Sequence, residues 1–118
     1  MTQHDPGVTF RQMLDFAREA RMLAAGRSAN DLVTNRGFFL ALSRLLEMLG
    51  EAARRIPSEI RDRYPELRWK GMTGLRDWIA HGYDELDLDL IWDTVVNDLD
   101  PLIQRLERII PDWPIEEG

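Results

Sequence analysis

Apolar residues recur along two stretches of the chain with the spacing of a helix. From residue 38 to residue 56, and again from residue 88 to residue 109, they follow one another at alternating steps of four and three residues. Such steps place the side chains on one face of a helix, where they can pack against a partner helix. The pattern predicts two long helices whose apolar seams consist of Phe38, Leu42, Leu45, Leu49, Ala52 and Ile56, and of Leu88, Trp92, Val95, Leu99, Leu102, Leu106 and Ile109.

Capping and stop residues predict two further helices, one before and one after the first seam. Thr9 is followed three residues later by a glutamine, as in a capping box, so we expect the first helix to begin there and to end near Gly26. We expect another helix over residues 69–81. Gly71 and Gly74 weaken the first half of that helix, or they allow a second helix to cross closely.

These elements predict an all-α fold, an antiparallel bundle of four to five helices. The chain has 118 residues, the size of one domain, so we expect a single helical domain over residues 1–118 with frayed ends at 1–7 and 111–118. Pro101 lies inside the last seam and lacks a backbone N–H, which predicts a kink there. The DELDLDL stretch before this helix is interpreted as an acidic lead-in rather than a strand, because carboxylates stabilise helix N-termini.

Charge and composition narrow the classes of function. Lys and Arg number 15 and Asp and Glu number 21, so the net charge is −6 and the isoelectric point is about 4.9. We do not expect a protein this acidic to bind nucleic acid non-specifically, but it can act on RNA through one local basic site. The absence of cysteine excludes disulfides, iron–sulfur clusters and cysteine-ligated zinc, and it fits a reducing cytoplasm. No apolar run approaches the ~18 residues of a membrane span and no signal peptide is visible, so we expect a cytoplasmic protein without a membrane partner.

One segment, RDWIAHGYD, concentrates polar chemistry between apolar residues. It holds Arg76, Asp77, His81 and Tyr83 within eight residues. In the plainer interpretation these side chains form caps, ion pairs and a half-buried aromatic contact. In the other, they cleave RNA without a metal, because histidine accepts a proton near pH 7 and arginine grips phosphate oxygens through two donors. Arg76 and His81 point about 140° apart on a regular helix, so either the helix distorts near the following glycine or a second copy of the chain completes the site.

The same residues carry a resemblance to a known family. RDWIAHGY resembles the R-x4-6-H motif of the HEPN superfamily of ribonucleases, in the R-x4-H-x-Y form typical of its HepT-like branch. The likeness extends to GEAARRIP at 50–57, to YPELRWKGMTGLR at 64–76 and to the Ile91–Trp92 pair, and it is weaker in the first 35 residues. Asp77 departs from the pattern, since asparagine is frequent there in this branch. A carboxylate at this position could orient Arg76 or weaken its grip on phosphate.

The resemblance implies a fold and a function together. It implies a homodimer of helical bundles, the toxin of a type VII toxin–antitoxin system, which cleaves tRNA or mRNA with no cofactor and no metal. Arg76 and His81 would be the catalytic residues, with Asp77 in support. The partner would be a minimal nucleotidyltransferase antitoxin that transfers AMP from ATP to the motif tyrosine, here Tyr83. AMP on Tyr83 would add bulk and negative charge beside the catalytic residues and block the phosphate subsite.

Candidate RNA contacts near the motif each have a plainer explanation as well. Arg54, Arg55 and Lys70 could form a basic rim for RNA, or they could belong to an ordinary solvated face. Trp69 could stack on a base, or it could belong to the core. The acidic side chains within residues 84–89 could bind Mg²⁺, but a helix lead-in explains them better, so no metal site is predicted.

The sequence also allows two functions without catalysis. The chain could be a non-catalytic helical partner or substrate-docking subunit of a minimal nucleotidyltransferase, which its acidic charge and Asp77 both permit. It could also be a purely structural helical dimer, but then the Arg–His–Tyr cluster has no explanation. RNA cleavage by the isolated chain separates the catalytic function from both alternatives.

Overall fold

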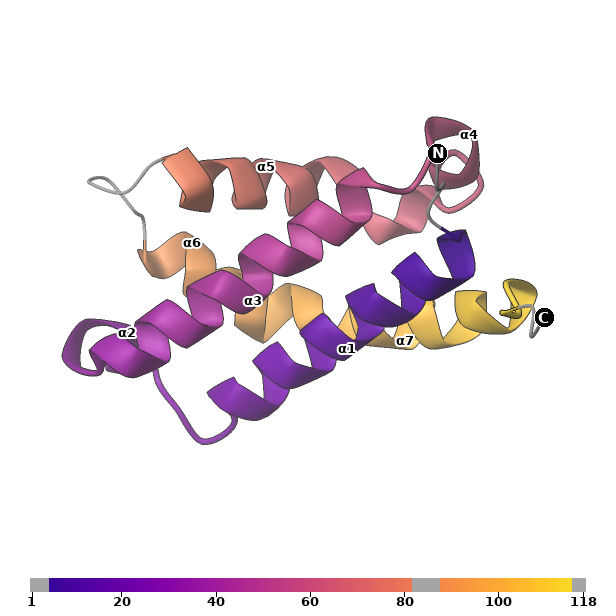
Figure 1. Ribbon diagram of the computed structural model, residues 1–118. Helices are drawn as coiled ribbons and strands as arrows, with labels where there is room; N and C mark the ends of the chain where they lie inside the picture. Colours follow the sequence, from indigo (N-terminus) through magenta and orange to yellow (C-terminus); the bar gives the residue numbers. More distant parts are fainter. Residues whose placement is uncertain (1–4, 82–87, 116–118) are drawn as a thin grey trace.

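The computed structural model describes residues 5–81 and 88–115, and helices are its only regular elements over those residues. Figure 1 shows the longer helices running in alternating directions, so the predicted all-α helical bundle is confirmed. The longer elements are α1 (Pro6–Ala24), α3 (Arg36–Arg54), α5 (Trp69–His81), α6 (Leu88–Asp93) and α7 (Leu99–Ile109). The short elements between or after them are α2 (Asp31–Thr34), α4 (Ser58–Arg61), η1 (Pro65–Leu67) and η4 (Ile110–Asp112).

The first helix begins earlier than the sequence pattern predicted. The Asp5 side chain accepts a hydrogen bond from the Gly7 N–H at 2.8 Å, and Pro6 occupies the first helical position. Thr9 lies inside the helix with 2% of its surface exposed, and its hydroxyl contacts the Asp5 carbonyl. The prediction of Thr9 as the N-cap is therefore wrong, because an aspartate directly before a proline forms the stronger start signal upstream.

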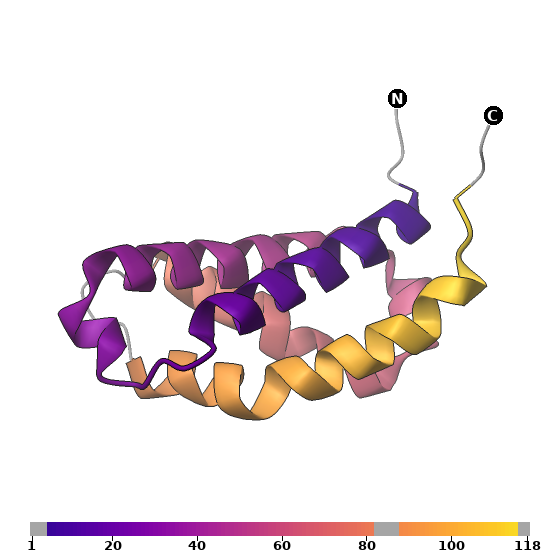
Figure 2. The same cartoon turned by 90° about the horizontal axis from the view of Figure 1, so that it is seen from below.

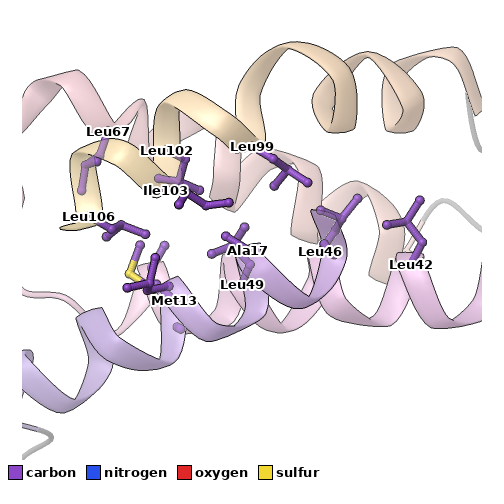
Figure 3. Close-up of a cluster of buried hydrophobic side chains, with 14 of the residues drawn as sticks. Met13, Ala17, Leu42, Leu46, Leu49, Leu67, Leu99, Leu102, Ile103 and Leu106 are labelled. Carbon is purple, nitrogen blue, oxygen red and sulfur yellow. The ribbon is translucent and has the colours of Figure 1, made fainter. Parts of the chain in front are cut away.

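Helices α1, α3 and α7 share one apolar core, part of which is drawn in Figure 3. Phe10 and Met13 of α1, Leu42 of α3 and Leu106 of α7 are fully enclosed. Burial of these side chains removes apolar surface from water, which is the main stabilising term of the bundle. Both predicted seams face this core, although the N-terminal part of the second seam is only partly buried.

The helical run that carries Pro101 is interrupted upstream of the proline. The hydrogen bonding is π-helical over Thr94–Asp98, and α7 begins at Leu99. Pro101 therefore lies in the first turn of α7, and its nitrogen cannot donate to the carbonyl of Asn97. The backbone hydrogen bonds of the helix rearrange over the preceding turn instead. Figure 2 shows that the run from α6 to α7 changes direction there.

The C-terminal segment is tied to the bundle as far as Trp113. The Trp113 indole N–H donates to the Tyr64 hydroxyl at 3.0 Å, and the Trp113 carbonyl accepts from Arg11 at 2.8 Å. Its ring also packs at 6.0 Å from that of Phe10. Of the ends predicted to be frayed, residues 1–4 and 116–118 lie outside the described residues, whereas Pro6 belongs to α1 and residue 112 to η4. Within the described part of the chain, no helix has the length and apolar character needed to cross a bilayer.

Candidate active site

Helices α3 and α5 come into close contact where Gly50 faces Arg76. A Cβ atom added at Gly50 would lie 2.3 Å from the Arg76 Cβ and 2.7 Å from the Met72 carbonyl oxygen. A residue with a side chain would therefore push the helices apart, so Gly50 sets the depth at which Arg76 sits against α3. At Gly71 and Gly74 no atom lies within 4 Å of an added Cβ, so the prediction that these glycines allow a close helix crossing is wrong.

The Arg76 guanidinium is held between two carboxylates. Its Nη2 donates to Glu51 Oε1 at 2.5 Å, across the contact between α5 and α3, and its Nη1 donates to Asp77 Oδ1 at 3.1 Å. The side chain is 19% exposed, and its Nε is buried without a hydrogen-bond partner among the described residues. These two contacts occupy one N–H on Nη1 and one on Nη2, so both ends of the guanidinium are held by carboxylates of the described residues.

Asp77 is shared between two arginines. The same Oδ1 atom that accepts from Arg76 also accepts from Nη2 of Arg54, which lies on α3. The hydrogen bond from Arg54, followed by the one from Arg76, holds the pKa of the Asp77 carboxyl below its ordinary value. The hydrogen bond to Asp77 raises the pKa of the Arg76 guanidinium, with Glu51 adding to the effect against partial desolvation. Glu51, Arg54, Arg76 and Asp77 thus form a charge cluster with two cations and two anions.

His81 and Tyr83 complete the sequence motif. His81 is the last residue of α5, and α5 is α-helical along its whole length. The side chain of His81 is not among the parts of the chain that the structure describes. On such a helix Arg76 and His81 are about 140° apart. Tyr83 lies outside the described residues, as do most of the acidic side chains of residues 84–89. Among the residues that are described, no group of three or more His, Cys, Asp or Glu side chains could hold a metal ion.

The four predicted RNA contacts have different surroundings. Arg54 is engaged by Asp77, whereas Arg55 is exposed and donates to the Gln12 side chain at 3.0 Å. Lys70 is exposed at the edge of a groove of about 1420 Å³ between α5 and the helices α6 and α7. Trp69 is only 8% exposed, and its indole N–H donates to the Tyr64 carbonyl at 2.9 Å. Its ring belongs to the core, which is the alternative to base stacking that the sequence left open for Trp69.

Glu51 is the site residue that the sequence motif did not identify. Arg76, Asp77 and His81 follow one another on one helix, whereas Glu51 lies 25 positions before Arg76 and meets it only through the fold. The signal for it was the Gly-Glu pair of the GEAARRIP segment. The glycine brings α5 close to α3, and the glutamate that follows it reaches the arginine.

Comparisons with known proteins identify relatives along most of the chain. The family model described as "Ribonuclease HepT-like" matches residues 13–109. "Putative RNase MJ0127" of Methanocaldococcus jannaschii is 40% identical over 72 residues, which are 61% of this chain and 60% of that protein. "Putative RNase MJ1216" of the same organism is 27% identical over 95% of this chain and 93% of its own length. "Probable ribonuclease HepT" of Thermococcus cleftensis is 32% identical over 67% of this chain and 72% of its own length. No solved structure matches the chain.

Proposed function

Because the chain belongs to the HepT-like ribonuclease family, we propose that it is a metal-independent endoribonuclease that cleaves tRNA or mRNA. The observation that supports this most directly is the state of Arg76. Its guanidinium is partly buried and oriented by Glu51 and Asp77, and an arginine can grip phosphate oxygens through two donors. A cation that is held in position before the reaction begins stabilises the negative charge that develops on a phosphoryl group.

The proposed reaction uses the ribose 2′-hydroxyl as the nucleophile. The imidazole of His81 accepts the 2′-hydroxyl proton while the 2′-oxygen forms a bond to phosphorus. The bond from phosphorus to the 5′-oxygen of the next nucleotide breaks, that oxygen takes up a proton from water, and the protonated His81 returns its proton to the solvent. The products are a 2′,3′-cyclic phosphate and a 5′-hydroxyl, and Arg76 binds the phosphate oxygens throughout.

We further propose that the active form is a homodimer in which the two copies share the site. Arg76 and His81 belong to one regular helix, so a single α5 presents them in directions about 140° apart. A two-fold dimer can place Arg76 of one copy opposite His81 of the other. The exposed Arg55 and Lys70 would then contact the RNA backbone beside the site.

Regulation of the enzyme forms the last part of the proposal. The chain would act in the cytoplasm as the toxin of a type VII toxin–antitoxin pair, and a minimal nucleotidyltransferase would inactivate it by transferring AMP from ATP to Tyr83. Tyr83 is two residues from His81 in the sequence. A phosphate ester there would compete with RNA for Arg76, because phosphate groups pair readily with arginine.

The second candidate function is a non-catalytic partner subunit of such a nucleotidyltransferase. The pairing of Arg76 with two carboxylates favours it, because both repel an incoming phosphate. Cleavage of RNA by the chain alone separates the two functions.

The decisive experiment incubates purified wild type, His81→Ala and Arg76→Lys with total tRNA in the presence of EDTA. We expect wild type to leave 2′,3′-cyclic phosphate ends, and His81→Ala to cleave at least about a hundredfold more slowly. Arg76→Lys keeps the charge but loses the two-donor fork, so it should also be impaired. His4→Ala replaces the other histidine of the chain and should match wild type.

Mixed dimers test the shared site in the same assay. An equimolar mixture of Arg76→Ala and His81→Ala chains should regain part of the activity, because one site of each mixed dimer keeps both residues. Full cleavage by His81→Ala would overturn the catalytic assignment. No cleavage by wild type, once mass spectrometry has excluded AMP on Tyr83, would favour the partner subunit.

A further inference from the structure

We propose that Asp77 is an internal ligand of Arg76 that a substrate phosphate displaces, and that Arg54 is a positioning residue that holds Asp77 once it is displaced. This inference rests on the proposed function, since it assumes that Arg76 binds an RNA phosphate. It assigns Arg54 a role through Asp77 rather than a direct contact with RNA. It also gives the two carboxylates beside Arg76 different roles.

The shared oxygen atom is the first observation behind this proposal. Asp77 Oδ1 accepts from both Arg76 Nη1 and Arg54 Nη2, so the carboxylate already touches both of the partners between which it would move. Arg76 and Asp77 are neighbours on one helix, and neighbouring side chains of a helix do not face each other. Arg54 approaches Asp77 from α3, across the helix contact. Asp77 can therefore give up Arg76 and keep Arg54 without any movement of the backbone.

The second observation is the difference between the two carboxylates. Glu51 reaches Arg76 from α3 next to Gly50, where α5 packs closely, and its contact with Nη2 measures 2.5 Å. It is the contact that fixes the guanidinium against α3. Asp77, Arg54 and Glu51 are similarly exposed, at 49%, 48% and 44%, so the two carboxylates differ in the length of their contacts and in the helix that carries them. Exchange at Asp77 therefore takes place in a solvated environment, where breaking one ion pair costs little.

The role of Arg54 follows from the charges of the cluster. A phosphate that binds Arg76 adds negative charge beside the Asp77 carboxylate. Arg54 offsets the repulsion, because it stays paired with Asp77 when Arg76 turns its Nη1 donor to the phosphate. Without Arg54, Asp77 would have Arg76 as its one cationic partner in the charge cluster and would compete with RNA for it.

A double-mutant cycle tests whether Arg54 acts through Asp77. The affinity of a labelled mixed-sequence 2′-O-methyl oligoribonucleotide, which cannot be cleaved by 2′-hydroxyl attack, is measured for wild type, Arg54→Gln, Asp77→Asn and the double variant. We expect Arg54→Gln to weaken binding about fivefold in the wild-type background and less than about twofold in the Asp77→Asn background. Asp77→Asn alone should tighten binding. Thermal unfolding of each variant checks that the fold is unchanged.

Arg55→Gln is the matched control, because Arg55 is the adjacent cation on the chain and pairs with Gln12 instead of a carboxylate. It should weaken binding by the same factor in both backgrounds. An equal loss for Arg54→Gln in both backgrounds would mean that Arg54 contacts RNA directly, and would overturn the inference. If wild type binds this RNA but leaves tRNA uncut, the proposed ribonuclease function is refuted. The double-mutant cycle would still report whether Arg54 acts on RNA binding through Asp77.

Discussion

Helix α3 contacts its neighbours through two faces that are built by opposite means. The face toward α1 and the shared apolar core consists of large apolar side chains such as Leu42 and Leu46, which are almost completely buried. The face toward the part of α5 that carries Arg76 has a glycine where the helices touch, with the charged side chains of Glu51 and Arg54 around it. One face gains stability from burial, and the other gives up that gain to hold a cation in place.

The difference shows how a small bundle can combine stability with a polar site. The core between α1, α3 and α7 contains no buried charged side chain among the described residues, so the apolar face supplies stability without charged groups in its interior. The α5 side can then tolerate a partly buried arginine whose Nε has no hydrogen-bond partner among the described residues. Substitutions on the two faces should accordingly separate stability from activity.

Gly50→Ala should produce the largest combined effect. The added Cβ would lie 2.3 Å from the Arg76 Cβ, so α5 must shift, and overpacking of this kind costs about 1–3 kcal/mol. Because the shift displaces Arg76, we expect RNA cleavage per folded molecule to fall about a hundredfold. Urea unfolding and the tRNA assay measure the two quantities.

Two variants of the same helix serve as controls for Gly50→Ala. Leu42→Ala opens a cavity in the core and should cost about 2–5 kcal/mol, yet leave the cleavage rate of the folded fraction unchanged. Gly37→Ala has its nearest neighbour, Asn35 Oδ1, at 3.6 Å and should leave both stability and activity intact. Equal activity of Gly50→Ala and Gly37→Ala would contradict the role given to the helix contact.

Glu51→Gln should have a smaller and purely functional effect. The amide keeps the size of the side chain but loses the charge that orients Arg76, so kcat should fall about tenfold. KM should fall as well, because one negative charge that repels RNA is removed. A variant that merely unfolds would lower kcat in proportion to its folded fraction and leave KM where it was.

Glu47→Gln is the matched control, since Glu47 lies one turn away on the same helix and pairs with Arg44. It should leave both constants unchanged. A KM that rises in Glu51→Gln would show that Glu51 supports RNA binding rather than the orientation of Arg76.

The sequence was sufficient for what depends on periodicity and on local order. The seams of α3 and α7 and the bounds of α5 follow from spacing, and the motif with Arg76 and His81 is contiguous. Neither the Glu51–Arg76 ion pair nor the role of Gly50 in the helix contact could be predicted from spacing. Both depend on which helices meet and how closely they pack. The burial of Trp69 has the same origin, since it is fixed by Phe10 and Tyr64 from other parts of the chain.

The smallest expected effect is on the acid stability of the charge cluster. The pKa of the Asp77 carboxyl is lowered from its ordinary value of 3.8, chiefly by the hydrogen bond from Arg54 and then by that from Arg76. A carboxylate with a depressed pKa stabilises the fold at pH values above 3.8, and this contribution is lost as the pH falls through the lowered value.

The melting temperatures of wild type and Asp77→Asn should thus differ at neutral pH and converge in acid, with Asp15→Asn on the exposed face of α1 as the control. The difference should be small, because Asp77 is half exposed and solvent screens its ion pairs. A gap that widens as the pH falls would mean that Asp77 destabilises the folded cluster, and it would contradict the pairing on which the division between the two faces of α3 depends.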